Sequence, residues 1–139
     1  MKPSDIPSPR RRALIVEDEA LIAEELRERL LRAGFFVIAA VASAEEGIEI
    51  AIREQPDLVL MDIRLRGAKD GIEAAQEIRK RVDLPIVYIS AHSDQLTVER
   101  AKRTDHDGFI RKPFHRSDLQ STVEIAMKRY AIRVNRQKQ

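Results

Sequence analysis

The chain contains no cysteine and no long apolar run. Without cysteine it forms neither a disulfide framework nor a zinc–thiolate site. Without a run of ~20 apolar residues it has no candidate membrane-spanning helix. The first twelve residues, MKPSDIPSPRRR, hold proline and charge but no apolar core, which excludes a secretory signal there. We therefore expect a cytoplasmic protein that does not insert into membranes.

The composition is that of one globular domain. The 139 residues are 43% hydrophobic and 35% charged, and this length suits one domain with a substantial core. The net charge of +2 hides basic ends around an acidic body. Basic ends can contact nucleic acid or anionic membrane, although the plainer interpretation is that they keep the chain in solution. We expect a flexible basic segment over residues 1–12, a domain over 13–130 and a basic tail over 131–139.

Five short apolar runs divide the chain, and most show no alternation with polar residues. They cover residues 13–16, 35–41, 58–61, 85–90 and 108–110. Continuous runs of valine, isoleucine and leucine are typical of strands that are covered on both faces, as in parallel sheets.

Helical patterns fill the spaces between these runs. Ile22, Leu26, Leu30 and Ala33 recur at helical spacing, and Gly34 follows where a helix C-cap glycine belongs. A capping-box pattern at Ser43 and Glu46 predicts a second helix, which Pro56 ends. Apolar residues at helical spacing predict a third helix before Pro85, with the stripe Ile72, Ala75, Ile78 and Val82. A fourth helix is expected over about 94–103, and a fifth carries the apolar stripe Leu119, Val123, Met127 and Tyr130. Five β-α units in succession predict an α/β domain with a parallel sheet and helices on both faces.

Polar side chains gather where these strands end. In an open α/β sheet, ligands bind beyond the carboxyl ends of the strands. The first strand leads into Glu17 and Asp18, the third ends in Asp62, the fourth in Ser90, and the fifth is followed by Lys112. Three neighbouring carboxylates repel one another unless a cation joins them, and Mg²⁺ accepts such oxygen ligands. Lys112 would add a fixed positive charge.

Each of these residues also has a plainer interpretation. Asp62 alone suits a turn or a helix N-cap, and the Glu17–Asp18 pair suits the positive end of a helix. Ser90 could satisfy a nearby backbone group. The site interpretation is favoured because all of these groups arise at one edge of one sheet.

Five sequence motifs resemble the response-regulator receiver family, the CheY-like domains of two-component signalling. They are LIVEDE, LVLMDIRL, DGIEAAQEIR, PIVYISA and GFIRKPF, in that order, and the resemblance covers about residues 12–130. It implies a doubly wound, flavodoxin-like (βα)5 domain with a five-stranded parallel sheet in the order 2-1-3-4-5.

The resemblance also implies roles for the residues at the sheet edge. Asp62 would accept a phosphoryl group from a phosphohistidine. Glu17 and Asp18 would hold Mg²⁺ (or Mn²⁺), with Asp62 and the backbone carbonyl of Arg64 completing the protein ligands. Ser90 would hydrogen-bond the new phosphoryl group, and Lys112 would pair with it.

Further roles follow from the same resemblance. The bond from Lys112 to Pro113 is expected to be cis. Phe109 takes the aromatic switch position, and Ala91 is the small residue that leaves the site open. Arg64 and His92 flank the path of attacking water and are expected to tune the lifetime of the phosphoryl group. Glu17, Ser90 and Phe109 stand where the family often has aspartate, threonine and tyrosine.

The expected partners are a sensor histidine kinase or a histidine phosphotransfer protein, and a downstream protein target. The fourth helix, fifth strand and fifth helix would form the face that changes on phosphorylation, with homodimerisation through that face as one outcome. No helix-turn-helix follows Tyr130, so we expect no DNA binding. A single-domain regulator is the first interpretation, and a receiver fragment of a longer regulator or hybrid sensor kinase is the alternative.

Two other functions were weighed. Phosphatases of the haloacid dehalogenase type also use an aspartate after a strand, but they need a second aspartate two residues on, where this chain has Arg64. A binding module that is never phosphorylated would need an incomplete acidic pocket. No P-loop or G-x-G-x-x-G is present, which argues against nucleotide binding. We expect no enzyme with a separate substrate, because such a receiver catalyses only its own phosphorylation and dephosphorylation.

Overall fold

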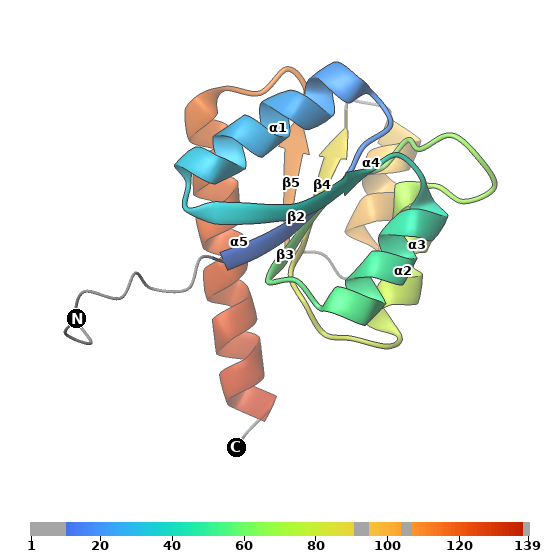
Figure 1. The fold of residues 1–139 in the computed structure, drawn as a ribbon. Coiled ribbons are helices and arrows are strands. Elements are labelled where there is room, and N and C mark those ends of the chain that lie inside the picture. Colours follow the sequence, from blue (N-terminus) through green and yellow to red (C-terminus); the bar gives the residue numbers. More distant parts are fainter. Residues whose placement is uncertain (1–10, 91–94, 104–106, 138–139) are drawn as a thin grey trace.

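The computed structural model describes residues 11–90, 95–103 and 107–137. Strands and helices alternate along this part of the chain, as the sequence predicts (Figure 1). The elements are β1 (Arg11–Val16), α1 (Ala20–Arg32), β2 (Phe35–Val41), α2 (Ala44–Glu54), β3 (Leu58–Asp62), α3 (Gly71–Arg79), β4 (Ile86–Ser90), α4 (Gln95–Lys102), β5 (Gly108–Arg111) and α5 (Arg116–Gln137).

The strands form one parallel sheet in the order β2-β1-β3-β4-β5. This confirms the doubly wound topology expected from the sequence. Helices cover both faces: α1 and α5 pack on one, and α2, α3 and α4 pack on the other (Figure 1). The carboxyl ends of all five strands therefore open on one edge of the sheet, between the two helical layers.

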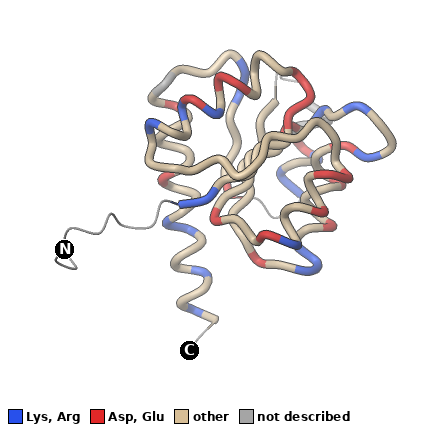
Figure 2. The backbone as a smooth tube through the Cα atoms, in the orientation of Figure 1, with Lys and Arg blue, Asp and Glu red and all other residues tan. Residues whose placement is uncertain are grey.

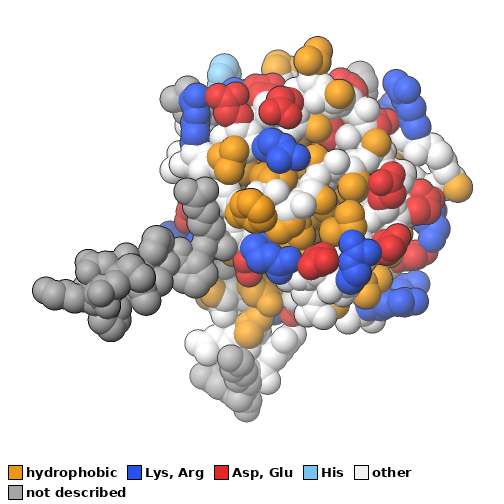
Figure 3. Space-filling view, viewed as in Figure 1, with side chains coloured by type: hydrophobic (Ala, Val, Ile, Leu, Met, Phe, Trp, Pro, Cys, Tyr) orange, Lys and Arg blue, Asp and Glu red, His pale blue; other side chains and the backbone are white. Residues whose placement is uncertain are grey.

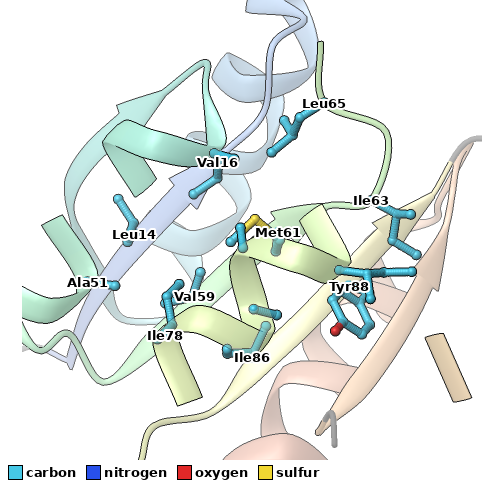
Figure 4. Packing of buried hydrophobic residues seen from close by; sticks show 14 of the residues in the cluster. Leu14, Val16, Ala51, Val59, Met61, Ile63, Leu65, Ile78, Ile86 and Tyr88 are labelled. Carbon is cyan, nitrogen blue, oxygen red and sulfur yellow. The ribbon is translucent and has the colours of Figure 1, made fainter. Parts of the chain in front are cut away.

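Successive residues of the central strands enter opposite halves of the core. In β1, Ala13 and Ile15 pack against the α1–α5 layer, whereas Leu14 and Val16 pack against α2 and α3. Figure 4 shows the second half, where Val16, Met61 and Tyr88 lie beneath the α2–α3 layer. Because both faces are buried, the strands need apolar residues at every position, which explains their unbroken runs.

The helix termini agree only in part with the predicted signals. Gly34 follows α1 with a φ of +93°, so the predicted terminal glycine is confirmed. The hydroxyl of Ser43 accepts the N–H of Glu46 at 3.2 Å, which is half of the predicted capping box. The complete capping box lies at Asp70 and Glu73 instead, at the start of α3. Its D-x-x-E spacing was visible in the sequence.

Three boundaries differ from the predicted ones by two residues or more. β1 begins at Arg11, inside the predicted N-terminal segment, because Arg11 and Arg12 pair with β2. α3 ends at Arg79, before Val82, which packs on the core from the following loop. α5 continues to Gln137, into the predicted tail, where Arg133 forms ion pairs with the body of the domain. Residues 1–10 lie outside the described residues.

β2 is an edge strand without a charged residue. Its sequence, FFVIAAV, leaves Phe36 half exposed, and apolar side chains gather around this edge in the centre of Figure 3. Among the described helices, none combines the length and apolar character that a bilayer crossing requires.

Candidate functional site

Three strands deliver charged side chains to one point at the carboxyl edge of the sheet. Val16 pairs with Met61 in the β1–β3 register, so Glu17 and Asp62 follow side by side. Lys112 follows β5, and its backbone N–H donates to the carbonyl of Ser90 at 2.8 Å. The structure thus brings together the acids and the amine that the sequence places at this edge, with Ser90 at the end of the neighbouring strand β4.

A buried lysine links two of the acids. Lys112 Nζ lies 2.5 Å from Glu17 Oε1 and 3.6 Å from Asp62 Oδ2. Glu17 is 3% exposed and Asp62 4% exposed, so both carboxylates are largely removed from water. Buried charges need close partners, and here one ammonium group serves two carboxylates.

Asp18 completes a cluster of three acids. Each of Glu17, Asp18 and Asp62 offers a carboxylate oxygen, and these oxygens lie within 4.8 Å of one another. Asp18 also accepts the backbone N–H of Arg66 at 3.3 Å. Several carboxylate oxygens at this spacing fit a hard divalent cation such as Mg²⁺.

Electrostatics at the cluster are unbalanced towards negative charge. Burial, together with the hydrogen bond and charge of Glu17, raises the pKa of Asp62 to about 7, against the opposing effect of Lys112. Burial alone would also raise the pKa of Glu17, but hydrogen bonds with Asp62 and Lys112 hold it below its usual value. Burial would lower the pKa of Lys112, but its hydrogen bond to Glu17 and the neighbouring carboxylates raise it. A bound cation would therefore reduce the repulsion between these carboxylates, which agrees with a cation-binding role.

The loop after Asp62 fits tightly against it. The backbone N–H of Arg64 donates to Asp62 Oδ1 at 3.1 Å, and the N–H of Gly71 donates to the carbonyl of Ile63 at 2.8 Å. A Cβ atom on Gly71 would lie 2.0 Å from the carbonyl oxygen of Asp62. Only glycine fits there. Gly71 is not among the predicted site residues, although the DG pair after the loop is a signal for it in the sequence.

The remaining predicted residues are placed as follows. Ser90 is fully buried at the end of β4. Phe109 lies in β5, half-buried, and packs on the core cluster of α2 and α3. The Lys112–Pro113 peptide bond is cis. The side chain of Arg64 is exposed, and the role of its carbonyl as a ligand stays a prediction. Ala91 and His92 lie outside the described residues.

Comparison with known proteins indicates one family. The response regulator receiver domain family matches residues 13–124. The transcriptional regulatory protein PdtaR of Mycobacterium tuberculosis is 40% identical over 120 residues, which are 86% of this chain and 58% of that protein. The chain thus spans 58% of the length of this curated relative.

Solved structures show the same similarity. The signal receiver domain of a modulated diguanylate cyclase from Desulfovibrio desulfuricans G20 is 34% identical, with a TM-score of 0.83, over 90% of this chain and 99% of that one. The N-terminal domain of a response regulator/sensory box/GGDEF 3-domain protein from Carboxydothermus hydrogenoformans is 30% identical, with a TM-score of 0.79, over 89% and 99% of the two chains.

Proposed function

This chain belongs to the response regulator receiver domain family, and we propose on that premise that Asp62 is its phosphoacceptor. The observation that carries the proposal is the buried arrangement of Lys112 between Glu17 and Asp62, with Asp18 beside them. It combines a carboxylate nucleophile, a fixed cation and a set of metal ligands at the open edge of the sheet.

The acidic cluster fits a divalent cation. Glu17, Asp18 and Asp62 would hold Mg²⁺, or Mn²⁺, together with the backbone carbonyl of Arg64. The bound ion would neutralise charge on the transferring phosphoryl oxygens.

The residues of the chain supply the nucleophile and its surroundings. A carboxylate oxygen of Asp62 attacks the phosphorus of a phosphohistidine on the partner. The phosphorus–nitrogen bond breaks, and its electron pair stays on the imidazole nitrogen. Because the pKa of Asp62 is raised to about 7, positive charge near the carboxylates is needed to keep it ionised and nucleophilic. Lys112 is already within reach of Asp62 to pair with the product.

The switch uses side chains on β4, which lies beside the strand of the nucleophile, and on β5, the next strand of the sheet. After transfer, Asp62 carries a dianionic group, and the Ser90 hydroxyl moves to hydrogen-bond it. Phe109, on the adjacent strand β5, turns into the volume that Ser90 leaves. This changes the face formed by α4, β5 and α5, so that a local charge event biases a two-state surface.

Partners follow from this role. The phosphoryl donor is a sensor histidine kinase or a histidine phosphotransfer protein, and the output is a downstream protein target or a homodimer formed through the α4–β5–α5 face. The protein acts on no separate substrate. Arg64 stands where a phosphatase of the haloacid dehalogenase type would need its second aspartate.

Phosphorylation with a small donor tests the assignment to Asp62. With Mg²⁺ and acetyl phosphate, intact mass should show one added phosphoryl group on the wild type and none on Asp62→Asn. Asp57→Asn is the matched control, because Asp57 is an exposed aspartate just before the same strand. If Asp62→Asn gains the same mass, or if the wild type gains none with Mg²⁺ present, the proposal is wrong.

A further inference from the structure

β5 has a buried ionic cluster at each of its ends. Lys112, directly after the strand, pairs with Glu17 and Asp62. Asp107, directly before it, is 2% exposed and pairs with Arg79 and Arg133. The first cluster belongs to the proposed phosphorylation site. The second lies at the opposite edge of the sheet and has no part in that chemistry.

Asp107 joins three elements. Its carboxylate accepts hydrogen bonds from the guanidinium groups of Arg79 in α3, at 2.7 Å, and Arg133 in α5, at 2.8 Å. It also accepts one from the backbone N–H of Ile86 in β4 at 2.9 Å. Burial alone would raise the pKa of Asp107, but these hydrogen bonds hold it below its usual range. Such a buried carboxylate is costly to leave without its partners, so the elements it joins are held together firmly.

α5 contacts β5 at more than this one point. The backbone carbonyl of Asp107 accepts a hydrogen bond from Arg129 at 3.5 Å. A Cβ atom on Gly108 would lie 2.7 Å from the side chain of Thr122, so the strand and the helix approach closely there. Arg133 also donates to both carboxylate oxygens of Asp83, at 2.9 and 3.4 Å. Arg129 and Arg133 thus join the start of β5 to the second half of α5 through Asp107, and Arg133 also joins α5 to the loop before β4.

The second half of α5 projects beyond the sheet. Figure 1 shows the helix continuing below the strands to its end at Gln137. In Figure 2 the charged residues of this projecting part are all basic. Arg129 and Arg133 contact the domain through Asp107, while Lys128 and Arg136 are exposed.

An ionic pair between α4 and the N-terminus of α3, near the proposed site, is more exposed than the Asp107 cluster. Arg100 of α4 pairs with Asp70, but the arginine side chain is 49% exposed. Exposed pairs contribute little to stability, whereas breaking a buried pair is strongly destabilising. Within the described residues, the more buried ionic pairs therefore lie at the two ends of β5, and the pair at its start reaches α5.

We infer that Asp107 is a positioning residue that makes β5 and the second half of α5 one mechanical unit, so that a shift of β5 at the Lys112 end is relayed to the projecting end of α5. The anchoring is independent of phosphorylation, while the relay rests on the function proposed for Asp62. The projecting end of α5 thereby becomes an output of the receiver in addition to the α4–β5–α5 face.

Hydrogen exchange of the full chain, read by mass spectrometry on peptides covering residues 126–137, tests the anchoring. Arg133→Gln removes the α5 partner of Asp107 and should raise the exchange rate there about tenfold, the equivalent of roughly 1.4 kcal/mol. Arg136→Gln is the matched control on the same helix and should leave the rate unchanged. Asp83→Asn removes only the outer pair of Arg133 and should have a smaller effect. Equal rates in Arg133→Gln and the wild type would overturn the anchoring.

Asp107→Asn provides a second variant with the same shape and no charge. It should raise exchange over residues 126–137 as Arg133→Gln does. An increase in Arg133→Gln without one in Asp107→Asn would show that Arg133 acts through Asp83, and would remove Asp107 from the anchor.

The relay is tested by repeating the exchange with Mg²⁺ and acetyl phosphate. Phosphorylated wild type should show altered exchange over residues 126–137, and Arg133→Gln should gain the phosphoryl group without that alteration. An unaltered rate in phosphorylated wild type, or an alteration that persists in Arg133→Gln, would overturn the relay. If the wild type gains no phosphoryl group, the proposed function and the relay fail together, and the anchoring is still judged by the rates without phosphate.

Discussion

At the scale of single residues, the site is a cluster of like charges. Glu17, Asp18 and Asp62 lie close together, Lys112 pairs with Glu17 and Asp62, and these two acids are almost fully removed from water. Such a cluster opposes folding wherever its carboxylates are all ionised. A reactive aspartate is therefore maintained at a cost in stability.

The cost predicts that Asp62→Asn stabilises the protein in EDTA, and that the gain depends on pH. The pKa of Asp62 is near 3.9 in an unfolded chain and about 7 in the folded protein. The folded state therefore binds more protons between these values, and the stability from Asp62 present below pH 4 is lost as the pH rises through 7. Asparagine does not ionise. The pKa of about 7 already includes the attraction of Lys112, so urea unfolding should show Asp62→Asn gaining on the order of 3 kcal/mol more at pH 8 than at pH 4.5.

Asp57→Asn, which replaces an exposed aspartate outside the cluster, is the control for this prediction. A gain for Asp62→Asn that is equal at both pH values would contradict the raised pKa of Asp62.

The sequence predicted the residues of the site better than their contacts. Glu17, Asp62 and Lys112 were identifiable because each follows an apolar run, and parallel strands bring such positions together. The direct pairing of Lys112 with Glu17, across 95 positions of the chain, depends on side-chain lengths that no local pattern encodes. Asp107 was missed for the same reason, since its partners Arg79 and Arg133 are 28 and 26 positions away.

At the scale of elements, the order of strands and helices could be predicted and several ends could not. The spacing of apolar residues along the sequence identifies a helix or strand, but the ends of that element depend on tertiary contacts. α5 passes the last apolar residue of its predicted stripe, Tyr130, because Arg133 is held by Asp83 and Asp107. α3 starts at Gly71, where the chain turns directly over the carbonyl of Asp62.

Because of that turn, we expect Gly71→Ala to lower the stability of the fold strongly. The added Cβ would meet the backbone oxygen of Asp62 at 2.0 Å, and backbone cannot yield as a flexible side chain does. We expect a loss of about 3 kcal/mol or more in urea unfolding, together with reduced phosphorylation by acetyl phosphate, because Asp62 is displaced.

Gly67→Ala is the matched control in the same loop. Gly67 has a φ of +111° but no atom within 4 Å of an added Cβ, so only backbone strain of about 1 kcal/mol is expected. If both variants lose the same free energy of unfolding, backbone strain in the loop, and not contact with Asp62, would explain the effect of Gly71→Ala.

At the scale of the whole molecule, cation binding and folding are coupled. The three acids meet only in the folded chain, so an ion that binds them stabilises the folded state by mass action. With Mg²⁺ at ten times its dissociation constant, the free energy of unfolding should rise by about 1.4 kcal/mol, and the melting temperature by on the order of 4 °C. Thermal melts with MgCl₂, against NaCl of equal ionic strength, measure this shift.

Asp18→Asn removes one ligand without touching Lys112 and should lose most of the shift. A shift of the same size in Asp18→Asn, or in NaCl, would mean that Mg²⁺ acts elsewhere or only by screening.

The chain separation of Glu17 and Lys112 has a consequence for protein synthesis. β1 leaves the ribosome long before β5, so a partly made chain holds its acids without their lysine. Acceptance of a phosphoryl group would then begin only after the fifth strand has joined the sheet. A nascent or truncated copy without β5 would present Asp62 without Lys112, so phosphorylation would be favoured only in chains whose five strands are assembled.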